Sequence, residues 1–403
     1  MMQILVVNNG SSSIKYQLYR MSDRQVLAKG TVERVGNSSS FLKHQDPTGE
    51  TITITQVIPD HKHGMKLVLD YLTDPQYGAI QSMNEITAIG HRVVHGGELF
   101  KESTLIDDNV IEGIQAVSQL APLHNPHNLT GIKVCTELIP EKPQVAVFDT
   151  VFHQTMDASA FMYALPYRYY QDYKIRKYGF HGTSHKYVSQ RAAELMGKSL
   201  SELKLITCHL GNGASITAVK NGKSVDTSMG FTPLEGLMMG TRCGDLDPAI
   251  IPYLLKTEKI DPASLDRIMN YESGLYGISG LSNDLRDIEK AAAEGNQRAQ
   301  LALDMYIHRI RKYIGSYLFI LGGADAIVFT AGVGENQSNI RQKICADLQW
   351  LNIHIDQESN QIRSEEKCIS TKDSSIEVWV IPTNEELMIA EETANLIAET
   401  ALA

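Results

Sequence analysis

The chain has 403 residues, of which 43% are hydrophobic and 21% are charged, and its formal net charge at pH 7 is −10. This length allows two domains with separate hydrophobic cores, and the composition is that of an ordinary globular protein. The negative net charge, together with scattered lysines and arginines, argues against a nucleic-acid partner.

The cysteines and the apolar stretches argue against secretion and against a membrane segment. The five cysteines are dispersed and never spaced C-x-x-C, which disfavours both a disulfide framework and a structural zinc site. The polar residue Asn8 comes too early for a signal peptide, and the apolar stretch 313–321 is too short to cross a bilayer. We therefore expect a cytoplasmic protein with no membrane partner.

Two similar hairpins are predicted, one in each half of the chain. Residues 4–18, ILVVNNGSSSIKYQL, read as two strands joined by a turn of Asn, Gly and Ser. Residues 205–219, LITCHLGNGASITAV, repeat this plan. Backbone N–H groups and hydroxyls in such turns point toward one anion, which suits the oxygens of a phosphate. Two such hairpins predict a duplicated nucleotide-binding fold with a cleft between the halves.

Hydrophobic periodicity predicts the remaining elements, which mix strands and helices throughout the chain. Strands are expected at 49–57 and 144–150, and helices at 64–73, 129–138, 184–196 and 297–320. Thr183 is the expected N-cap of the third of these helices. Residues 325–336 read as a strand, a glycine turn and a helix start, and residues 377–387 as a strand, a turn with proline and the C-terminal helix.

Nine motifs occur along the chain in a fixed order: NNGSSSIK, HRVVHGGE, LAPLHNPHN, AVFDTVFHQTM, YGFHGTSHKYVSQR, HLGNGASI, DTSMGFTPLEGLMMGTRCGDLDP, FTAGVGEN and IPTNEEL. Together they resemble the acetate kinase family, within the superfamily of acetate and sugar kinases, heat-shock ATPases and actin. The resemblance covers essentially the whole chain. It implies two duplicated ribonuclease-H-like α/β domains with an interdomain active-site cleft.

The resemblance also implies an activity and a division of the chain. The activity is a reversible, Mg2+-dependent transfer of the ATP γ-phosphoryl group to acetate, giving acetyl phosphate and ADP, with Mn2+ as a substitute metal. Residues 1–150 with 388–403 would form an N-terminal domain that carries the first phosphate hairpin and part of the acceptor site. Residues 151–387 would form the nucleotide-binding domain. The family also implies a homodimer.

The family places ATP on residues from four motifs of this sequence. The positions that match are Ser11, Ser13 and Lys15, then His209, Leu210, Gly211, Asn212 and Gly213, then Asp284, Leu285 and Arg286, and finally Gly332, Val333, Gly334, Glu335 and Asn336. Each segment also has a plainer interpretation, as a serine-rich turn, a surface helix start or a tight strand-to-helix turn. A Walker loop is excluded because Gly222-Lys223-Ser224 is preceded by Thr217 where that loop requires glycine.

The residues implied in catalysis are Arg92, Asp149, His181 and Arg242. Phosphoryl transfer needs cations around the moving group, and a carboxylate acceptor is already ionised near pH 7, so no general base is required. The two arginines would hold the acceptor carboxylate and the phosphoryl oxygens, and His181 would stabilise the transferring charge. The plainer alternatives are surface salt bridges for the arginines and a turn cap for Asp149.

The same resemblance implies a magnesium site at Asn8, Asp149 and Glu385, because Mg2+ favours few carboxylates and retained waters. A zinc site is the rival, since His91 and His95, like His181 and His185, are four residues apart. HRVVH reads as a strand, in which that spacing does not converge, and no HExxH motif occurs. We expect His127 and His153 to be structural.

The acceptor site is expected to combine Arg92 and His124 with an apolar pocket. The family positions around the substrate methyl group are Val94, Leu123, Phe180 and Pro233. A smaller residue at position 94 is typical of propionate kinases, so Val94 favours acetate. The plainer alternative is that these four residues belong to the ordinary hydrophobic core. Asn9 and Cys243 depart from the small residue and the serine common in the family, and a free thiol at Cys243 suggests sensitivity to oxidants.

Two other functions stay open at this point. The first is a propionate kinase or another short-chain acyl kinase. The second, from a different class, is a nucleotide-switched binding protein of the chaperone-ATPase or actin type. A chaperone would need a peptide-binding domain in addition to the nucleotide fold, and the chain has no room for one.

Overall fold

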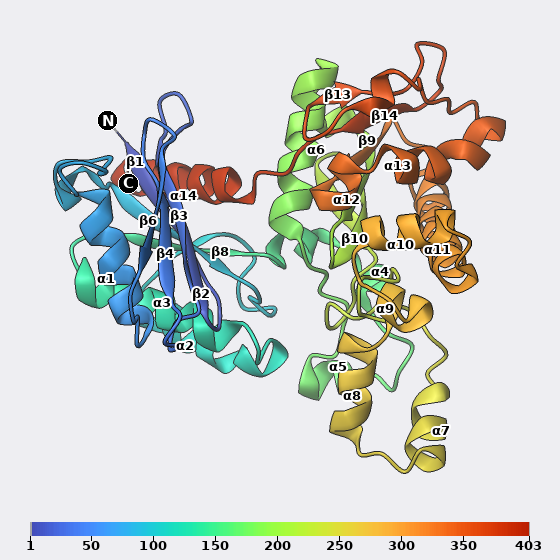
Figure 1. Cartoon of the computed structure of the whole chain (residues 1–403), viewed down its shortest axis with the longest axis horizontal. Helices are drawn as coiled ribbons and strands as arrows, with labels where there is room; N and C mark the ends of the chain where they lie inside the picture. Colours follow the sequence, from blue (N-terminus) through green and yellow to red (C-terminus); the bar gives the residue numbers. More distant parts are fainter. Residues whose placement is uncertain (1, 403) are drawn as a thin grey trace. The chain divides into compact units, whose positions relative to one another are not determined.

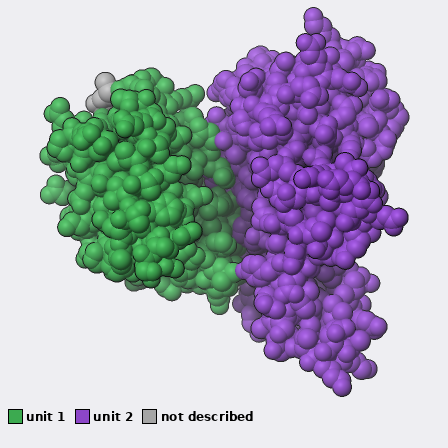
Figure 2. All heavy atoms as spheres, in the orientation of Figure 1, with its two compact units in different colours: residues 1–151, 384–403 green, residues 152–383 purple. Residues whose placement is uncertain are grey.

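The computed structural model describes residues 2–402 (Figure 1). The chain divides into two compact units, coloured separately in Figure 2. Unit 1 comprises Met1–Val151 and Asn384–Ala403, and unit 2 comprises Phe152–Thr383. Residues 384–387, which the sequence places with the second domain, therefore belong to unit 1. The reason is that the C-terminal helix begins at Glu385 and packs on the first sheet.

Unit 1 contains an eight-stranded mixed sheet in the order β5-β4-β3-β2-β1-β6-β8-β7. Its strands are β1 (Gln3–Asn9), β2 (Ser13–Arg20), β3 (Gln25–Glu33), β4 (Phe41–Gln45), β5 (Thr51–Thr55), β6 (Ala88–Val93), β7 (Thr104–Leu105) and β8 (Gln144–Phe148). Within this sheet, as far as its strands are described, only the pairs β1–β6 and β6–β8 are parallel. The predicted first hairpin is confirmed as β1 and β2, which pair antiparallel.

Helices cover the two faces of this sheet. They are α1 (His61–Leu72), α2 (Asp108–Ala116), α3 (Asn125–Leu138) and α14 (Glu385–Leu402). Met65 and Val68 of α1 share a core with Ile14 and Leu18 of β2, and α3 adds Cys135 to it. On the opposite face α14 comes so close to β6 that a side chain at Gly90 would strike Ile389 and Thr393.

Unit 2 repeats the strand plan of unit 1. Its six-stranded sheet has the order β11-β10-β9-β12-β14-β13. The strands are β9 (Lys204–Leu210), β10 (Ala214–Lys220), β11 (Lys223–Thr227), β12 (Ala326–Thr330), β13 (Lys367–Cys368) and β14 (Glu377–Val380). The parallel pairs β9–β12 and β12–β14 match β1–β6 and β6–β8, and the outer strands are antiparallel in both sheets. The predicted duplication of an α/β plan is thus confirmed.

The helices of unit 2 are α4 (Ala158–Phe161), α5 (Arg168–Tyr173), α6 (Gly182–Met196), α7 (Ile250–Thr257), α8 (Pro262–Tyr271), α9 (Gly274–Ser279), α10 (Leu285–Ala293), α11 (Gln297–Leu321), α12 (Ala331–Asn336) and α13 (Ser338–Cys345). Two of them, α6 and α11, follow the predicted spans 184–196 and 297–320, and two other expectations need correction. The prediction that Thr183 caps α6 is wrong, because the helix starts earlier and its N-cap is His181 in the left-handed region, with φ of 55°. The expected glycine turn at 332–334 is also wrong, because α12 follows β12 directly and includes those glycines.

Among the described residues, none of the helices combines the length and the apolarity that a bilayer crossing requires. The apolar stretch 313–321 forms the end of α11, whose buried residues Ile310, Ile314 and Tyr317 belong to the core of unit 2. Its apolar character therefore serves packing.

A buried polar contact beneath the first sheet requires a glycine at position 30 of β3. The phenol of Tyr16 lies 2.6 Å from Nδ1 of His44, and both side chains are buried. Gly30 is paired with both residues, and a Cβ at this position would strike the Tyr16 phenol and the carbonyl of Lys43. The absence of a side chain at Gly30 therefore lets Tyr16 reach His44.

We predict that Gly30→Ala lowers the free energy of unfolding by about 1–3 kcal/mol, because the strand backbone has to move to admit the methyl group. Gly315→Ala is the matched control, since Gly315 lies within α11 and a Cβ there meets no atom within 4 Å. This control should raise stability by about 0.5–1 kcal/mol through helix propensity. Urea denaturation followed by circular dichroism measures both, and an unchanged Gly30→Ala midpoint would contradict the account.

Candidate active site

The parallel strands of unit 1 bring three predicted site residues to one edge of the sheet. Asn8 is near the end of β1, Arg92 is near the end of β6, and Asp149 follows β8 directly. The backbone N–H of Asp149 donates to the carbonyl of Val93 at 3.0 Å, which fixes the two strand ends together. Carboxyl ends of parallel strands are the usual place for a ligand in α/β sheets.

Arg92 and Asp149 form a buried ion pair at this edge. The Asp149 side chain is 2% exposed and that of Arg92 is 22% exposed. The alternative that Arg92 only makes a surface salt bridge is therefore excluded. Burial alone would lower the pKa of Arg92, but the carboxylates of Asp149, Glu385 and Glu386 outweigh it and raise that pKa. The guanidinium therefore stays charged in a cluster that has more carboxylates than cations.

Glu385 is the least compensated member of this cluster. Burial raises its pKa to about 7, and the nearby Asp149 carboxylate adds to the shift, while Arg92 and Lys15 act against it. Its Oε1 atom is buried and has no hydrogen-bond partner among the residues that the structure describes. A buried, orphaned carboxylate oxygen beside Asp149 and the Asn8 strand end is a donor set that suits Mg2+. The three residues thus fit the predicted metal.

The raised pKa of Glu385 makes the stability of the metal-free protein depend on pH. Its ordinary pKa is 4.5, so between pH 4.5 and about 7 the folded state holds the proton more tightly than the unfolded state. The stabilising contribution is therefore complete below pH 4.5 and is lost as the pH rises through about 7.

We predict that Glu385→Gln, which mimics the protonated acid, equals the wild type in stability at about pH 4 and exceeds it at pH 8 by at most about 3 kcal/mol. Mg2+ should stabilise the wild type at pH 8 and not the variant. Denaturant titrations at the two pH values provide the measurement, with Glu399→Gln on the exposed part of α14 as control. A difference in stability between wild type and variant that is the same at both pH values would count against a raised pKa of Glu385.

The first hairpin places its polar residues near Asn8. Gly10 N–H donates to the Ser13 carbonyl at 2.8 Å, Ser11 lies exposed in the turn, and Lys15 on β2 is the register partner of Asn8. The departure at Asn9 has a structural role, because its Nδ2 donates to the carbonyl of His127 at 2.6 Å. Asn9 thus ties the hairpin to the start of α3.

The loop after β6 is held by two asparagines that the sequence did not reveal as site residues. Asn128 Oδ1 accepts from Val94 N–H at 3.1 Å, and Asn125 Oδ1 accepts from His95 N–H at 3.0 Å. Val94 is buried, whereas Leu123 is 64% exposed and so is no core residue. His124 is the N-cap position of α3. The HNPHN run of the sequence contains both asparagines, but nothing in the sequence indicated which backbone groups they would contact.

In unit 2, His181 is held by a stack and a hydrogen bond. Its ring stacks on that of His209, with centroids 4.0 Å apart, and its Nδ1 lies 2.9 Å from Ser215 Oγ. The Ser215 hydroxyl also lies 2.8 Å from His185 Nε2, whose Nδ1 bonds to Thr207 Oγ1 at 2.7 Å. Burial lowers the pKa of His185 well below its ordinary value, so this ring is neutral.

His153 and His91 make hydrogen bonds within the fold. His153 lies within 2.9 Å of Ser224 Oγ and 3.0 Å of the Phe180 carbonyl, and His91 within 2.7 Å of Gln144 Oε1. Within residues 2–402, the structure shows no group of three His, Cys, Asp or Glu side chains placed to hold a metal ion. His181 and His185, the pair considered above for zinc, both contact the hydroxyl of Ser215.

Arg242 is a half-buried cation with no ion-pair partner in the described part of the chain. Its Nη1 donates to the carbonyl of Pro233 at 3.2 Å, and burial lowers its pKa. A Cβ at Gly213 would lie 3.2 Å from this nitrogen and 3.7 Å from His181 Nε2. The turn of the second hairpin therefore lies against both side chains. This arrangement of an uncompensated guanidinium, an imidazole and a glycine turn suits a phosphoryl group.

The two residues of unit 2 expected in the acceptor pocket differ in exposure. Phe180 is buried, and Pro233, whose carbonyl accepts from Arg242, is half-buried. Burial also raises the pKa of the Cys243 thiol, whose Sγ donates to the carbonyl of Gly244. A higher thiol pKa leaves less thiolate, so this environment disfavours oxidation of Cys243.

A cavity of about 590 Å³ in unit 2 gathers half of the predicted nucleotide residues. Those that line it are Gly211, Asn212, Asp284, Leu285, Arg286, Gly332, Val333 and Asn336. Gly240, Leu275, Asn283, Gln337 and Arg363 also line it, and the sequence did not indicate them. Asn283 and Gln337 adjoin predicted residues, but Arg363 stands on a segment with no motif.

Gly334 and Glu335 are placed beside this cavity rather than in its lining. A Cβ at Gly334 would lie 3.3 Å from the backbone of Phe329, so glycine there allows α12 to pack on β12. Glu335 Oε1 accepts from Thr383 N–H at 3.1 Å. Asp284 caps α10 by accepting from Arg286 N–H at 2.9 Å, as in the helix-start interpretation, and its carboxylate still lines the cavity.

Buried Arg341 connects two walls of the cavity. Its guanidinium donates to the carbonyls of Gly334 and Glu335 in α12, at 2.8 and 3.0 Å. It also donates to Asn360 Oδ1, to the Asn360 carbonyl and to the Ile362 carbonyl, at 2.8, 2.6 and 3.2 Å. One side chain thereby holds the segment before Arg363 against the helix that carries Val333 and Asn336.

The comparisons with known proteins agree with this geometry. The model of the acetokinase family matches residues 3–391. The chain belongs to the acetokinase family. It is similar to the acetate kinase of Halothermothrix orenii, with 59% identity over 98% of this chain and 100% of that protein. This membership makes the protein a kinase.

Solved structures show the same fold. The crystal structure of Porphyromonas gingivalis acetate kinase has a TM-score of 0.95 at 47% identity, over 98% of this chain and 100% of that one. A propionate kinase from Francisella tularensis has a TM-score of 0.91 at 43% identity, with the same coverage. Since proteins named for two different acceptors share this fold, the choice of acceptor depends on individual side chains.

Proposed function

We propose that the protein catalyses the reversible, Mg2+-dependent transfer of the γ-phosphoryl group of ATP to acetate, giving acetyl phosphate and ADP. The observation that carries this proposal is the uncompensated Arg242 beside the turn of the second hairpin, whose Gly211 and Asn212 line the 590 Å³ cavity. A nucleotide in that cavity would direct its phosphates toward Arg242 and His181. The full-length similarity to proteins named acetate kinase supports the same reaction.

The groups have distinct roles in the proposed reaction. Arg242 and His181 stabilise the phosphoryl oxygens, and Arg92 holds the acceptor carboxylate by a bidentate contact. Ser11, Ser13 and Lys15 supply donors for phosphate oxygens. Acetate is already ionised near pH 7, so catalysis consists of positioning and charge stabilisation.

Asn8, Asp149 and Glu385 would hold Mg2+, with Mn2+ as a substitute. When bound, the metal supplies positive charge that neutralises the phosphates. The chain contributes Arg92, which orients Asp149 through their ion pair. A hydroxamate-trapping assay with acetate and ATP, with and without Mg2+, tests the proposed reaction directly. Its family membership also supports a cytoplasmic homodimer, which light scattering on the purified protein tests.

The runner-up acceptor is propionate, because a propionate kinase shares the fold at 43% identity. Val94 favours acetate in this proposal, since it is buried and its N–H is fixed by Asn128. The proposed pocket also includes Leu123, Phe180, Pro233 and His124.

We predict that Arg92→Ala and Arg242→Ala each lower kcat about 10²–10³-fold, because each removes a charge that stabilises the transition state. Arg267→Ala is the control, since Arg267 pairs with Glu272 at the surface of α8 and is 71% exposed. Steady-state kinetics and circular dichroism of the three variants provide the comparison. Folded Arg92 and Arg242 variants with the kcat of the control would refute the assigned roles.

We further predict a higher kcat/KM for acetate than for propionate in the wild type. Val94→Ala should shift this ratio toward propionate by about tenfold to a hundredfold at most, because one methylene is worth about 1–3 kcal/mol in such a pocket. Val68→Ala, in the core beneath α1, should leave the ratio unchanged. A higher kcat/KM of the wild type for propionate would instead support a propionate kinase.

A further inference from the structure

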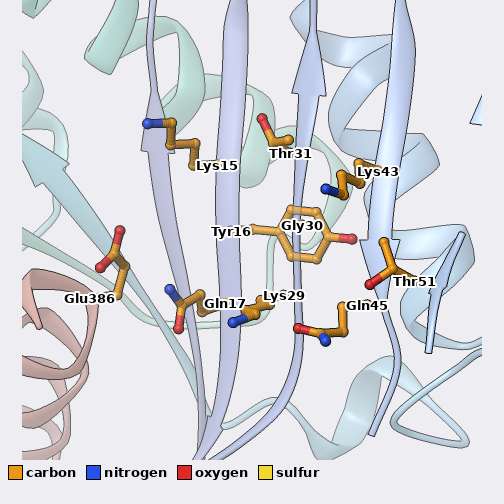
Figure 3. A pocket seen from close by; sticks show the side chains of 10 residues that line it. All are labelled: Lys15, Tyr16, Gln17, Lys29, Gly30, Thr31, Lys43, Gln45, Thr51 and Glu386. Carbon is orange, nitrogen blue, oxygen red and sulfur yellow. The ribbon is translucent and has the colours of Figure 1, made fainter. Parts of the chain in front are cut away.

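A second cavity, of about 430 Å³, lies on the first sheet in unit 1 (Figure 3). Polar side chains of neighbouring strands line most of it: Lys15 and Gln17 from β2, Lys29 and Thr31 from β3, Lys43 and Gln45 from β4, and Thr51 from β5. Glu386 of α14 lines the remaining side, together with Tyr16 and Gly30. Of these residues, the proposed reaction uses only Lys15.

The strand register puts the three lysines on one face of the sheet. Thr31 is the register partner of both Lys15 and Lys43, and Lys29 is the partner of Gln17. All three lysines are exposed, whereas the alternate residue Tyr16 is buried toward α1. Like charges gathered on neighbouring strands repel one another. None of the three has an ion pair within the part of the chain that the structure describes.

The floor of this cavity is rigid and continuous with the first hairpin. Beneath it, Tyr16 bonds to His44 through the space left by Gly30. The polar row of Lys15, Thr31 and Lys43 begins beside Asn8, because Asn8 is the register partner of Lys15. Lysines that extend outward from a phosphate-type turn give an anion more than one point of attachment.

We propose that this cavity binds an anion with two or more linked phosphate groups, held by Lys15, Lys29 and Lys43. Neighbouring strands are about 4.8 Å apart, so the β2 and β4 lysines start about 10 Å from each other. A single phosphate is too small to satisfy charges spread over that width, whereas a linked chain of phosphates matches it. Lysine ammonium groups suit phosphate as point charges.

Occupancy of this cavity has a consequence for catalysis, and this part rests on the proposed function. Lys15 would serve both the linked anion and the phosphates of ATP. The anion is therefore a competitive inhibitor with respect to ATP, and Lys29 and Lys43 determine how strongly it inhibits.

Isothermal titration calorimetry with inorganic tripolyphosphate, without divalent metal, tests the binding. We expect Lys29→Gln with Lys43→Gln to weaken binding about tenfold, as for two partly exposed charge contacts. The control is Lys66→Gln with Lys133→Gln, which makes the same change in net charge on exposed positions of α1 and α3. Unchanged binding in the first variant, or an equal loss in the control, overturns the proposal.

Inhibition kinetics at constant free Mg2+ test the link to catalysis. Tripolyphosphate should raise the KM for ATP in the wild type about tenfold more strongly than in the Lys29/Lys43 variant, whose basal kcat stays within about twofold of the wild type. Equal inhibition of both proteins overturns the competition through Lys15. If no acetate phosphorylation occurs but tripolyphosphate binding still requires Lys29 and Lys43, the proposed function fails and this anion site stands.

Discussion

The buried ion pair of Arg92 and Asp149 is the constraint on which unit 1 depends. It joins the ends of β6 and β8, and a lone guanidinium or carboxylate would be costly at this depth. Glu385 adds a second buried carboxylate at the start of α14. The cluster thus keeps an excess of negative charge that the protein alone neutralises only by protonation. A divalent cation would relieve this excess, so the charges that order the strand ends would also favour a bound metal.

Unit 2 has the opposite electrostatic character on the same strand plan. Its central cation, Arg242, contacts the Pro233 carbonyl and the Met239 thioether, and no carboxylate in the described part of the chain pairs with it. Neutral hydrogen bonds through Ser215 and the buried His185 hold His181 without adding charge. The clusters at the strand ends of the two sheets therefore differ in charge, with an excess of carboxylates around Glu385 and an unpaired cation at Arg242.

Much of this arrangement was predictable from local pattern. Both hairpins, the long helix α11 and the strand β8 before Asp149 follow from apolar periodicity and turn residues. The motifs also gave most of the residues that line the nucleotide cavity. Local rules failed at His181 and Ala331, because each adopts positive φ where tertiary packing overrides the preference of its residue type.

Other features depend on register and on distant segments. The row of lysines on β2, β3 and β4 exists only because of strand pairing, which spacing along the chain does not encode. Arg363 and Arg341 lie outside any recognisable motif, and only the fold brings them to the cavity that α12 lines. These positions mark the limit of inference from one sequence.

The five hydrogen bonds of Arg341 have a consequence for the thermodynamics of ligand binding. They fix α12 and residues 360–362 in the ligand-free protein, so this wall of the cavity is ordered in advance. A nucleotide that binds there need not order the wall, and less of its contact energy is lost to conformational entropy. Affinity for a nucleotide in this cavity can then arise from modest contacts.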